Sequence, residues 1–201
     1  MNRVLKCILI GFLMIIIMCL MISCTHAKTF NGRVIDADTK EPIEGAVVVV
    51  YWHEASWIPF GEWILRLKDV NETLTDKNGE WTTKGPAGSE VNSLAYHTAL
   101  MGVTFYTREP EFIVFKPGYC SWPNGFSIDA CRNRIKIIGS RDEGIGEGGT
   151  LELPKLTKRE DRIRALSIST PSGEYPPERT RELVRLINEE RRKFGLGEIS
   201  E

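Results

Sequence analysis

Short runs of apolar and β-branched residues, separated by clusters of Gly, Pro, Asn and Asp, fill the middle of the chain. The run TFNGRVI precedes the first such cluster, and the four-valine run AVVVVYW follows it. Runs of four to eight residues bounded by turn residues are typical of β-strands. The pattern predicts strands at 29–35, 46–52, 111–115, 134–138 and 150–153, and two more on either side of a turn within 73–83.

Two turns in this pattern predict hairpins. Residues 36–42, DADTKEP, have side chains that favour local backbone hydrogen bonds. Residues 76–79, Asp-Lys-Asn-Gly, supply the positive-φ positions of a tight hairpin. Two hairpins imply antiparallel pairing, and no helical pattern separates the strands. We therefore expect a mainly β fold, a β-sandwich, over residues 28–156.

The pattern changes beyond Pro154. Thr157 and Glu160 have capping-box spacing, which predicts a short helix with Thr157 as its N-cap. A linker rich in Pro, Ser and Gly follows, and Pro177 suits the first position of a second helix that continues through 178–194. One side of this helix is apolar, so we expect it to pack on its own sandwich, with docking on a partner as the alternative. Residues 157–201 are thus a predicted helical C-terminal extension.

The N-terminus has the order of a secretory signal, with basic Arg3 and Lys6 before the uncharged apolar run 8–22. As a helix this run spans roughly 22 Å, less than the roughly 30 Å of hydrocarbon in a bilayer, so cleavage is favoured over a permanent span. The tetrad MISC at 21–24 resembles a bacterial lipobox, although methionine stands where leucine is usual. The resemblance implies that residues 1–23 are a lipoprotein signal peptide and that Cys24 is lipidated. An uncleaved anchor with an incidental cysteine is the alternative.

Lipidation would determine where the protein resides. Two or three acyl chains hold a protein durably on a membrane, whereas one chain holds it weakly. A lipidated Cys24 therefore predicts a membrane-anchored protein of the cell envelope. By analogy with known lipoproteins, Thr25 in the next position indicates the outer membrane, on its periplasmic or surface side.

Charge and length narrow the function classes. Removal of residues 1–23 leaves 24 Lys and Arg against 27 Asp and Glu in 178 residues. This balance gives no electrostatic case for nucleic acid, which would require a clustered basic surface. The length suits one domain with an appendage.

Only one pair of cysteines is left to form a disulfide. Cys7 and Cys19 leave with the signal and Cys24 is the predicted lipid acceptor, so Cys120 and Cys131 remain. In an oxidising compartment a disulfide is the favoured interpretation. A redox pair or a metal site is the alternative, but redox pairs usually have CxxC spacing and a metal needs more ligands than two thiols.

Three segments resemble the carboxypeptidase regulatory-like domain: GRVIDADTKEPIEGAVVVV, TLTDKNGEW and FIVFKPGY. The resemblance spreads over about ninety residues, and it implies a transthyretin-like (prealbumin-like) Greek-key β-sandwich of about seven strands. It does not imply carboxypeptidase activity, because in that family this domain accompanies the catalytic one. The matching positions are Gly32, Val34, Asp36, Thr39, Pro42, Ile43, Gly45, Ala46, Val48, Thr75, Asp76, Gly79, Gly118 and Tyr119.

Motifs that carry chemistry are missing from the mature chain. His53 is not followed by a second histidine in HExxH spacing, and the chain has no GxSxG and no Gly-Lys phosphate loop. The acidic residues Asp36, Asp38 and Glu41 do not follow the EF-hand order, so an ordinary acidic turn is favoured over a calcium site. We therefore expect no catalytic residues, no cofactor and no metal.

Four large aromatics lie close together at the end of the second predicted strand and in the insertion that follows it: Trp52, Trp57, Phe60 and Trp63. With the insertion 53–69 they form a candidate ligand surface, either a stacking platform for a glycan or peptide or a contact with the bilayer interface. The alternative is that the insertion covers the open end of the sandwich and its aromatics complete the core.

These patterns together predict a non-enzymatic, lipid-anchored β-sandwich of the cell envelope that acts as an accessory or binding module. Its expected partners are the membrane, through the anchor, and an envelope protein or a glycan. The second hypothesis is a carbohydrate- or peptide-binding surface protein that uses the Trp-rich insertion. The third is an enzyme with an unrecognised site.

Overall fold

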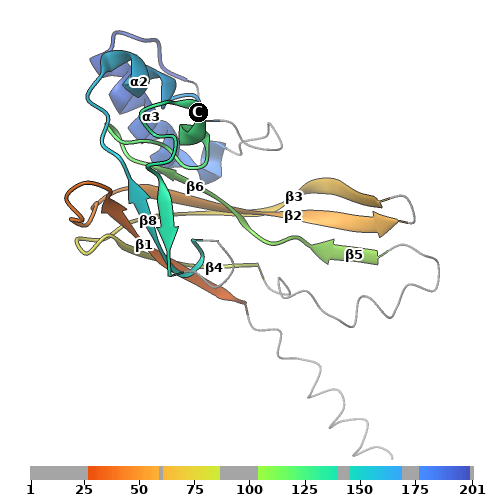
Figure 1. The fold of residues 1–201 in the computed structure, drawn as a ribbon. Helices are drawn as coiled ribbons and strands as arrows, with labels where there is room; N and C mark the ends of the chain where they lie inside the picture. The colour runs from red at the N-terminus through yellow and green to blue at the C-terminus, as the bar shows by residue number, and fades with distance from the viewer. Residues whose placement is uncertain (1–26, 59–60, 87–103, 140–144, 169–176, 200–201) are drawn as a thin grey trace, which may run out of the picture.

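The computed structural model describes residues 27–58, 61–86, 104–139, 145–168 and 177–199. Its strands form two sheets (Figure 1), so the expected mainly β fold is confirmed. Sheet A contains, in spatial order, β4 (Glu80–Lys84), β1 (Thr29–Asp36), β8 (Glu147–Leu153) and β7 (Lys136–Ile138). Sheet B contains β3 (Gly61–Leu74), β2 (Val47–Ile58), β5 (Thr104–Thr107) and β6 (Glu111–Phe115).

Strand β2 is the centre of sheet B. Antiparallel β3 pairs with it along its whole length, from Val47 opposite Leu74 to Ile58 opposite Gly61. The other edge of β2 is shared, because β6 pairs with 47–51 and β5 pairs with 54–57. In sheet A, β1 is antiparallel to β4 and parallel to β8.

The main core lies between the two sheets. Sheet B contributes Val48, Val50 and Trp52 of β2, and sheet A contributes Val34 of β1 and Leu151 of β8. Each of these side chains is fully buried. Burial of an aliphatic or aromatic side chain stabilises a fold by about 1.5–3 kcal/mol, so this layer is the largest favourable contribution to stability.

The opposite face of β2 is also covered. Val47, Val49 and Tyr51 alternate with the inner residues and belong to a second core, together with residues of the C-terminal helix α3 (Arg181–Lys193). The helix contributes Leu183, Leu186 and Ile187. The expectation that this helix packs on its own sheets is therefore confirmed.

The shorter helical segments connect these layers. They are η1 (Asn124–Ser127), α2 (Arg159–Arg164) and η2 (Pro177–Arg179), which precedes α3. The predicted capping box is wrong, since Lys158 rather than Thr157 is the N-cap of α2 and makes no side-chain capping bond. Because β8 is parallel to β1 and leads into α2, the helices lie at the end of the sheets where β1 finishes (Figure 1).

Both predicted hairpins are wrong, because each turn joins one sheet to the other. After residues 36–41, a single bridge pairs Ile35 with Pro42 before the chain crosses to sheet B. The turn Asp76–Gly79 is closed by a 2.8 Å bond from Gly79 N–H to the Asp76 carbonyl, but it connects β3 of sheet B with β4 of sheet A. The local turns therefore form as expected, and their strand partners differ.

The predicted insertion at 53–69 is not a separate segment between two strands. In the structure these residues continue strands β2 and β3, which form one long hairpin. Strand β5, which was not predicted, pairs with its outer part.

A substitution at Gly79 tests how closely the turn between β3 and β4 packs against β1. It has a φ of +73°, and a Cβ placed there would collide with the Val34 carbonyl oxygen. Gly139, with a φ of +78° and open space around a Cβ, is the matched control. We expect Gly139→Ala to cost about 1 kcal/mol from the left-handed conformation alone, and Gly79→Ala about 3 kcal/mol because overpacking adds to it. Urea denaturation measures both, and equal costs would contradict the close approach.

Candidate functional site

The four predicted aromatic residues do not form one exposed surface. Trp52 is fully buried in the main core, where its ring centroid lies 5.7 Å from that of Phe30. Its assignment to a ligand surface is therefore wrong. The indole is part of the core because β2 turns this residue inward, between the sheets.

The other aromatics belong to the outer part of the β2–β3 hairpin. Trp57 lies opposite Glu62 and Trp63 lies opposite Ser56 on the ladder. These are successive rungs, and successive positions of a strand belong to opposite faces of a sheet. The side chains of Trp57 and Trp63 themselves lie outside the part of the structure that is described. Phe60 lies outside the described residues.

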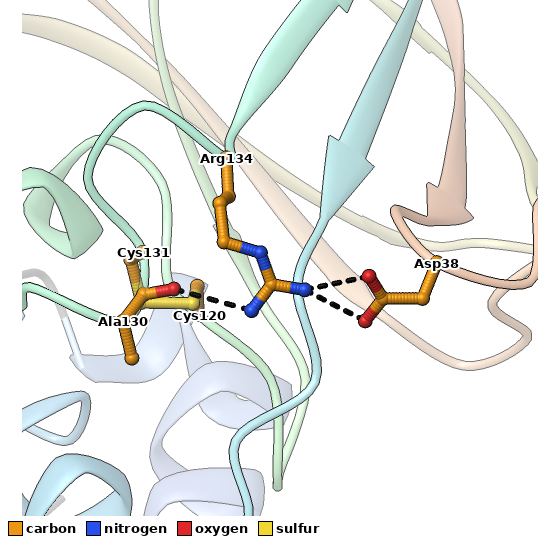
Figure 2. Close-up of a disulfide and its surroundings, with 5 residues drawn as sticks. All are labelled: Asp38, Cys120, Ala130, Cys131 and Arg134. Atoms are coloured by element: carbon orange, nitrogen blue, oxygen red, sulfur yellow. Dashed lines mark hydrogen bonds and ion pairs between the residues drawn. A yellow bond between two sulfur atoms is a disulfide. The ribbon is translucent and has the colours of Figure 1, made fainter.

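The predicted disulfide between Cys120 and Cys131 is present, and both residues are fully buried (Figure 2). It closes the segment that contains η1. Next to it, Arg134 binds both carboxylate oxygens of Asp38, at 2.6 and 2.8 Å, and also reaches the Ala130 carbonyl at 3.5 Å. The disulfide segment is thereby tied to the turn after β1, which is a structural role.

The acidic turn holds its carboxylates in hydrogen bonds rather than around an ion. Asp36 accepts bonds from the backbone N–H groups of Asp38 and Thr39, at 2.8 and 3.0 Å. Burial acts to raise the pKa of Asp36, but these bonds outweigh it, with help from the Tyr119 hydroxyl and the Lys155 ammonium. The pKa of Asp36 therefore lies below its ordinary value. Within the described ranges, no group of three or more His, Cys, Asp or Glu side chains is placed to hold a metal.

A polar cluster that the sequence did not reveal lies beside the helical layer on sheet B. Glu111 of β6 accepts a 3.1 Å bond from the Tyr51 hydroxyl and lies 3.5 Å from the Arg108 guanidinium. His53 is buried, with Nδ1 3.8 Å from Glu111, too far for a hydrogen bond. Its Nε2 has no hydrogen-bond partner in the part of the chain that the structure describes.

This cluster has the residue types of an acid–base site, and its hydrogen bonds also link β2 to β6. The Glu111 carboxylate is shared by a hydroxyl and a guanidinium, so its charge is already compensated. A general base needs to lie within about 3.2 Å of the proton that it takes. No described nucleophile stands at that distance from His53 Nε2.

Two other carboxylates hold the helical layer in place. Glu72 of β3 accepts bonds from the N–H groups of Glu182 and Leu183 in the first turn of α3, at 2.9 and 2.6 Å. Burial raises the pKa of Glu72, and the two N–H groups offset this only in part. At the other end of the helix, the buried Glu190 accepts a 2.7 Å bond from Arg162 of α2.

The predicted lipidation site, Cys24, and the predicted signal at 1–23 lie outside the described residues. In the ranges that are described, no helix has the length and apolar character needed to cross a bilayer. Comparison with models of known protein families and with curated proteins gave no match.

The disulfide predicts a measurable share of stability. The disulfide joins two residues that are 11 positions apart and so restricts the unfolded chain. Cys120→Ala/Cys131→Ala is therefore expected to lower the free energy of unfolding by about 2–3 kcal/mol. Urea denaturation of both proteins with and without reductant measures it. Reductant should lower the free energy of unfolding of the wild type to that of the double variant and leave the value for the variant unchanged. Equal stability of the two proteins without reductant would rule out this contribution.

Asp36 predicts a specific pH dependence. Because its folded pKa is lower than that of the unfolded chain, its contribution is present above about pH 4 and is lost as the pH falls through the folded value. At pH 7, Asp36→Asn should cost about 2 kcal/mol, since bonds to a charged group are lost. The difference from the wild type should shrink toward pH 3.

The matched control for this prediction is Asp129→Asn. The Asp129 side chain is 90% exposed in a surface pair with Arg132, and such pairs contribute little. Urea denaturation at several pH values should show no change for this variant. A pH-independent cost of Asp36→Asn would contradict the assignment.

Proposed function

We propose that this protein is a non-enzymatic, lipid-anchored accessory module of the cell envelope, built as a transthyretin-like Greek-key β-sandwich. One observation carries the proposal: the polar residues that resemble the carboxypeptidase regulatory-like pattern are used to build turns. Thr75 accepts a 2.8 Å bond from Ala46 N–H and donates a 2.6 Å bond to the Ile43 carbonyl, so it joins the end of β3 to the start of β2.

Asp76 has the same kind of role in the second turn. Its carboxylate accepts bonds from the N–H groups of Asn78 and Glu80, both at 2.8 Å. Asp36 does so in the first turn. In both turns the backbone bonds go to Oδ1 of the aspartate, which fixes the carboxylate in a turn-building position. The motif residues therefore support a scaffold, and they leave function to surfaces elsewhere.

The disulfide supports the proposed location. Disulfides persist in oxidising compartments and are rare in the cytosol, so the buried Cys120–Cys131 bridge favours an exported chain. That agrees with the charged-then-apolar N-terminus and the lipobox-like tetrad before Cys24.

Lipidation of Cys24 is the experiment that tests this function. Mass spectrometry of the N-terminal peptide of the native protein should show a chain that begins at Cys24 and carries a diacylglyceryl group. In a detergent phase partition, the wild type should enter the detergent phase. Cys24→Ser blocks acylation, so that variant should keep its apolar N-terminus and an intact residue 1. An unmodified chain that begins at Met1 in the wild type would refute the proposal.

A further inference from the structure

We propose that the end of sheet A where β1 begins rests on the headgroups of the bilayer that holds Cys24, and that Lys84 binds anionic lipid there. This inference rests on the proposed lipid anchor, and it states which surface of the folded body the anchor brings to the membrane. The contact is polar and lies at headgroup level, without insertion into the hydrocarbon.

The fixed part of the chain begins four residues after Cys24, at Lys28. The Lys28 carbonyl accepts a 2.8 Å bond from Gly85 N–H. Its ammonium pairs with Glu147 at 2.6 Å and lies 5.2 Å from the centroid of the Phe30 ring. Lys28 is therefore the base of the tether, held to β8 and to the segment that follows β4.

The length of the tether limits how far this base can lie from the bilayer. Four peptide steps separate Lys28 from Cys24, and a fully extended chain covers at most about 14 Å in that length. The acyl chains of a lipidated Cys24 lie in the hydrocarbon, so the cysteine itself lies among the headgroups. Each headgroup layer is about 5–7 Å thick. Lys28 therefore lies within or just above the headgroups, whatever tilt the body adopts.

Lys84 shares the level of the tether's base. It is the last residue of β4 and lies opposite Thr29, the first residue of β1. Lys84 is exposed, and its ammonium pairs with no carboxylate of the described residues. The acidic residue at this end, Glu147, is already paired with Lys28. A lysine close to an anionic membrane surface contributes about 1 kcal/mol to binding, and the attraction acts over about 8 Å at physiological salt.

The rest of this end is polar. Thr29 and Thr82 are exposed on β1 and β4. Among the described residues, the exposed large apolar side chains belong to Leu74, Ile138 and Ile199, none of which lies in β1 or β4. A surface without exposed apolar side chains gains nothing from entering hydrocarbon, so the contact stays at headgroup depth.

The opposite end of sheet A provides a control position. The Gly79 carbonyl accepts a 2.8 Å bond from Val34 N–H, so the turn Asp76–Gly79 lies beside the far part of β1. Val34 is five residues from Thr29, about 16 Å at the usual rise of a strand. Figure 1 shows β1 running obliquely to β2 and β3, so the tether and the long hairpin leave the body in different directions.

The test uses the mature, lipidated chain in vesicles of phosphatidylethanolamine and phosphatidylglycerol. A fluorophore is attached at Thr29→Cys in one chain and at Lys77→Cys, in the exposed turn, in a matched chain. The lipid occupies the Cys24 sulfur and the native disulfide is fully buried, so the new thiol is the one that reacts. Some of the lipids carry a nitroxide, either on the headgroup or deep in an acyl chain.

We expect the headgroup nitroxide to quench the fluorophore at position 29 and not at 77, and the deep nitroxide to quench neither. Twelve Gly and Ser residues inserted between His26 and Ala27 add about 20 Å to the tether, so quenching at 29 should be lost. Lys84→Glu should reduce quenching at 29 in these vesicles and leave it unchanged in neutral phosphatidylcholine vesicles. Lys84→Arg keeps the charge and should behave as the parent chain does.

The outcomes separate this inference from the proposed function. If Cys24 is lipidated and the fluorophore at 29 is not quenched, the inference is overturned and the proposed function stands. Undiminished quenching after the insertion also overturns it, because the tether would not be what holds this end at the bilayer. No effect of Lys84→Glu would remove Lys84 from the contact. If Cys24 carries no lipid, the proposed function fails, and the inference fails with it.

Discussion

The rest of the structure depends on strand β2 being apolar on both faces. A strand in a two-sheet protein usually needs one apolar face, because the other meets water. In β2 the residues Val48 and Val50 face the space between the sheets, and Val47 and Val49 face outward. The outward side chains require a second cover, which α3 provides. The C-terminal extension is therefore a necessary layer of the domain and not an appendage.

This requirement explains why the helix is held by buried carboxylates. Apolar contacts alone do not fix the rotation or the axial position of a helix on a sheet, because they are not directional. Glu72 fixes the first turn of α3 through two backbone N–H groups, and Glu190 fixes the last turns through Arg162. Both carboxylates lose hydration, and charge-assisted hydrogen bonds offset that loss.

The sequence was a good guide to strands and a poor guide to their partners. The strand at 111–115 has the predicted bounds, and β1 and β8 overlap their predictions. Turn chemistry determines the local backbone, but it does not determine whether the chain returns beside the same strand or crosses to another sheet. At Asp76–Gly79 the expected turn forms, and the crossing follows from long-range bonds such as Val34 N–H to the Gly79 carbonyl.

The long hairpin was hidden by two irregularities. On β3, Lys68 has no partner between the pairs Trp52–Asp69 and His53–Leu67, and Leu65 has none between the next two pairs. Each extra residue shifts the alternation of apolar and polar positions by one, so the period-two signal of a strand is lost over 61–69 of β3. Trp52 is a different case, because it continues the alternation of Val48 and Val50 on β2 and so shares their face in the main core. The disulfide was predictable from the cysteine count together with the expected oxidising compartment, whereas the Glu72 cap joins residues 110 apart and left no local signal.

The two ends of the sheets differ in how readily their residues can be substituted. Residues that resemble the carboxypeptidase regulatory-like pattern, such as Asp36 and Gly79, are packed into the end where β1 finishes, and their backbone bonds leave little room for change. On β2, the last residue in the main core is Trp52. Beyond it, Ala55 and Ser56 are buried as well, but among the described residues neither belongs to the main core. The main core therefore ends at Trp52 on this strand, and beyond that point such a scaffold can acquire a specific contact with less effect on its core.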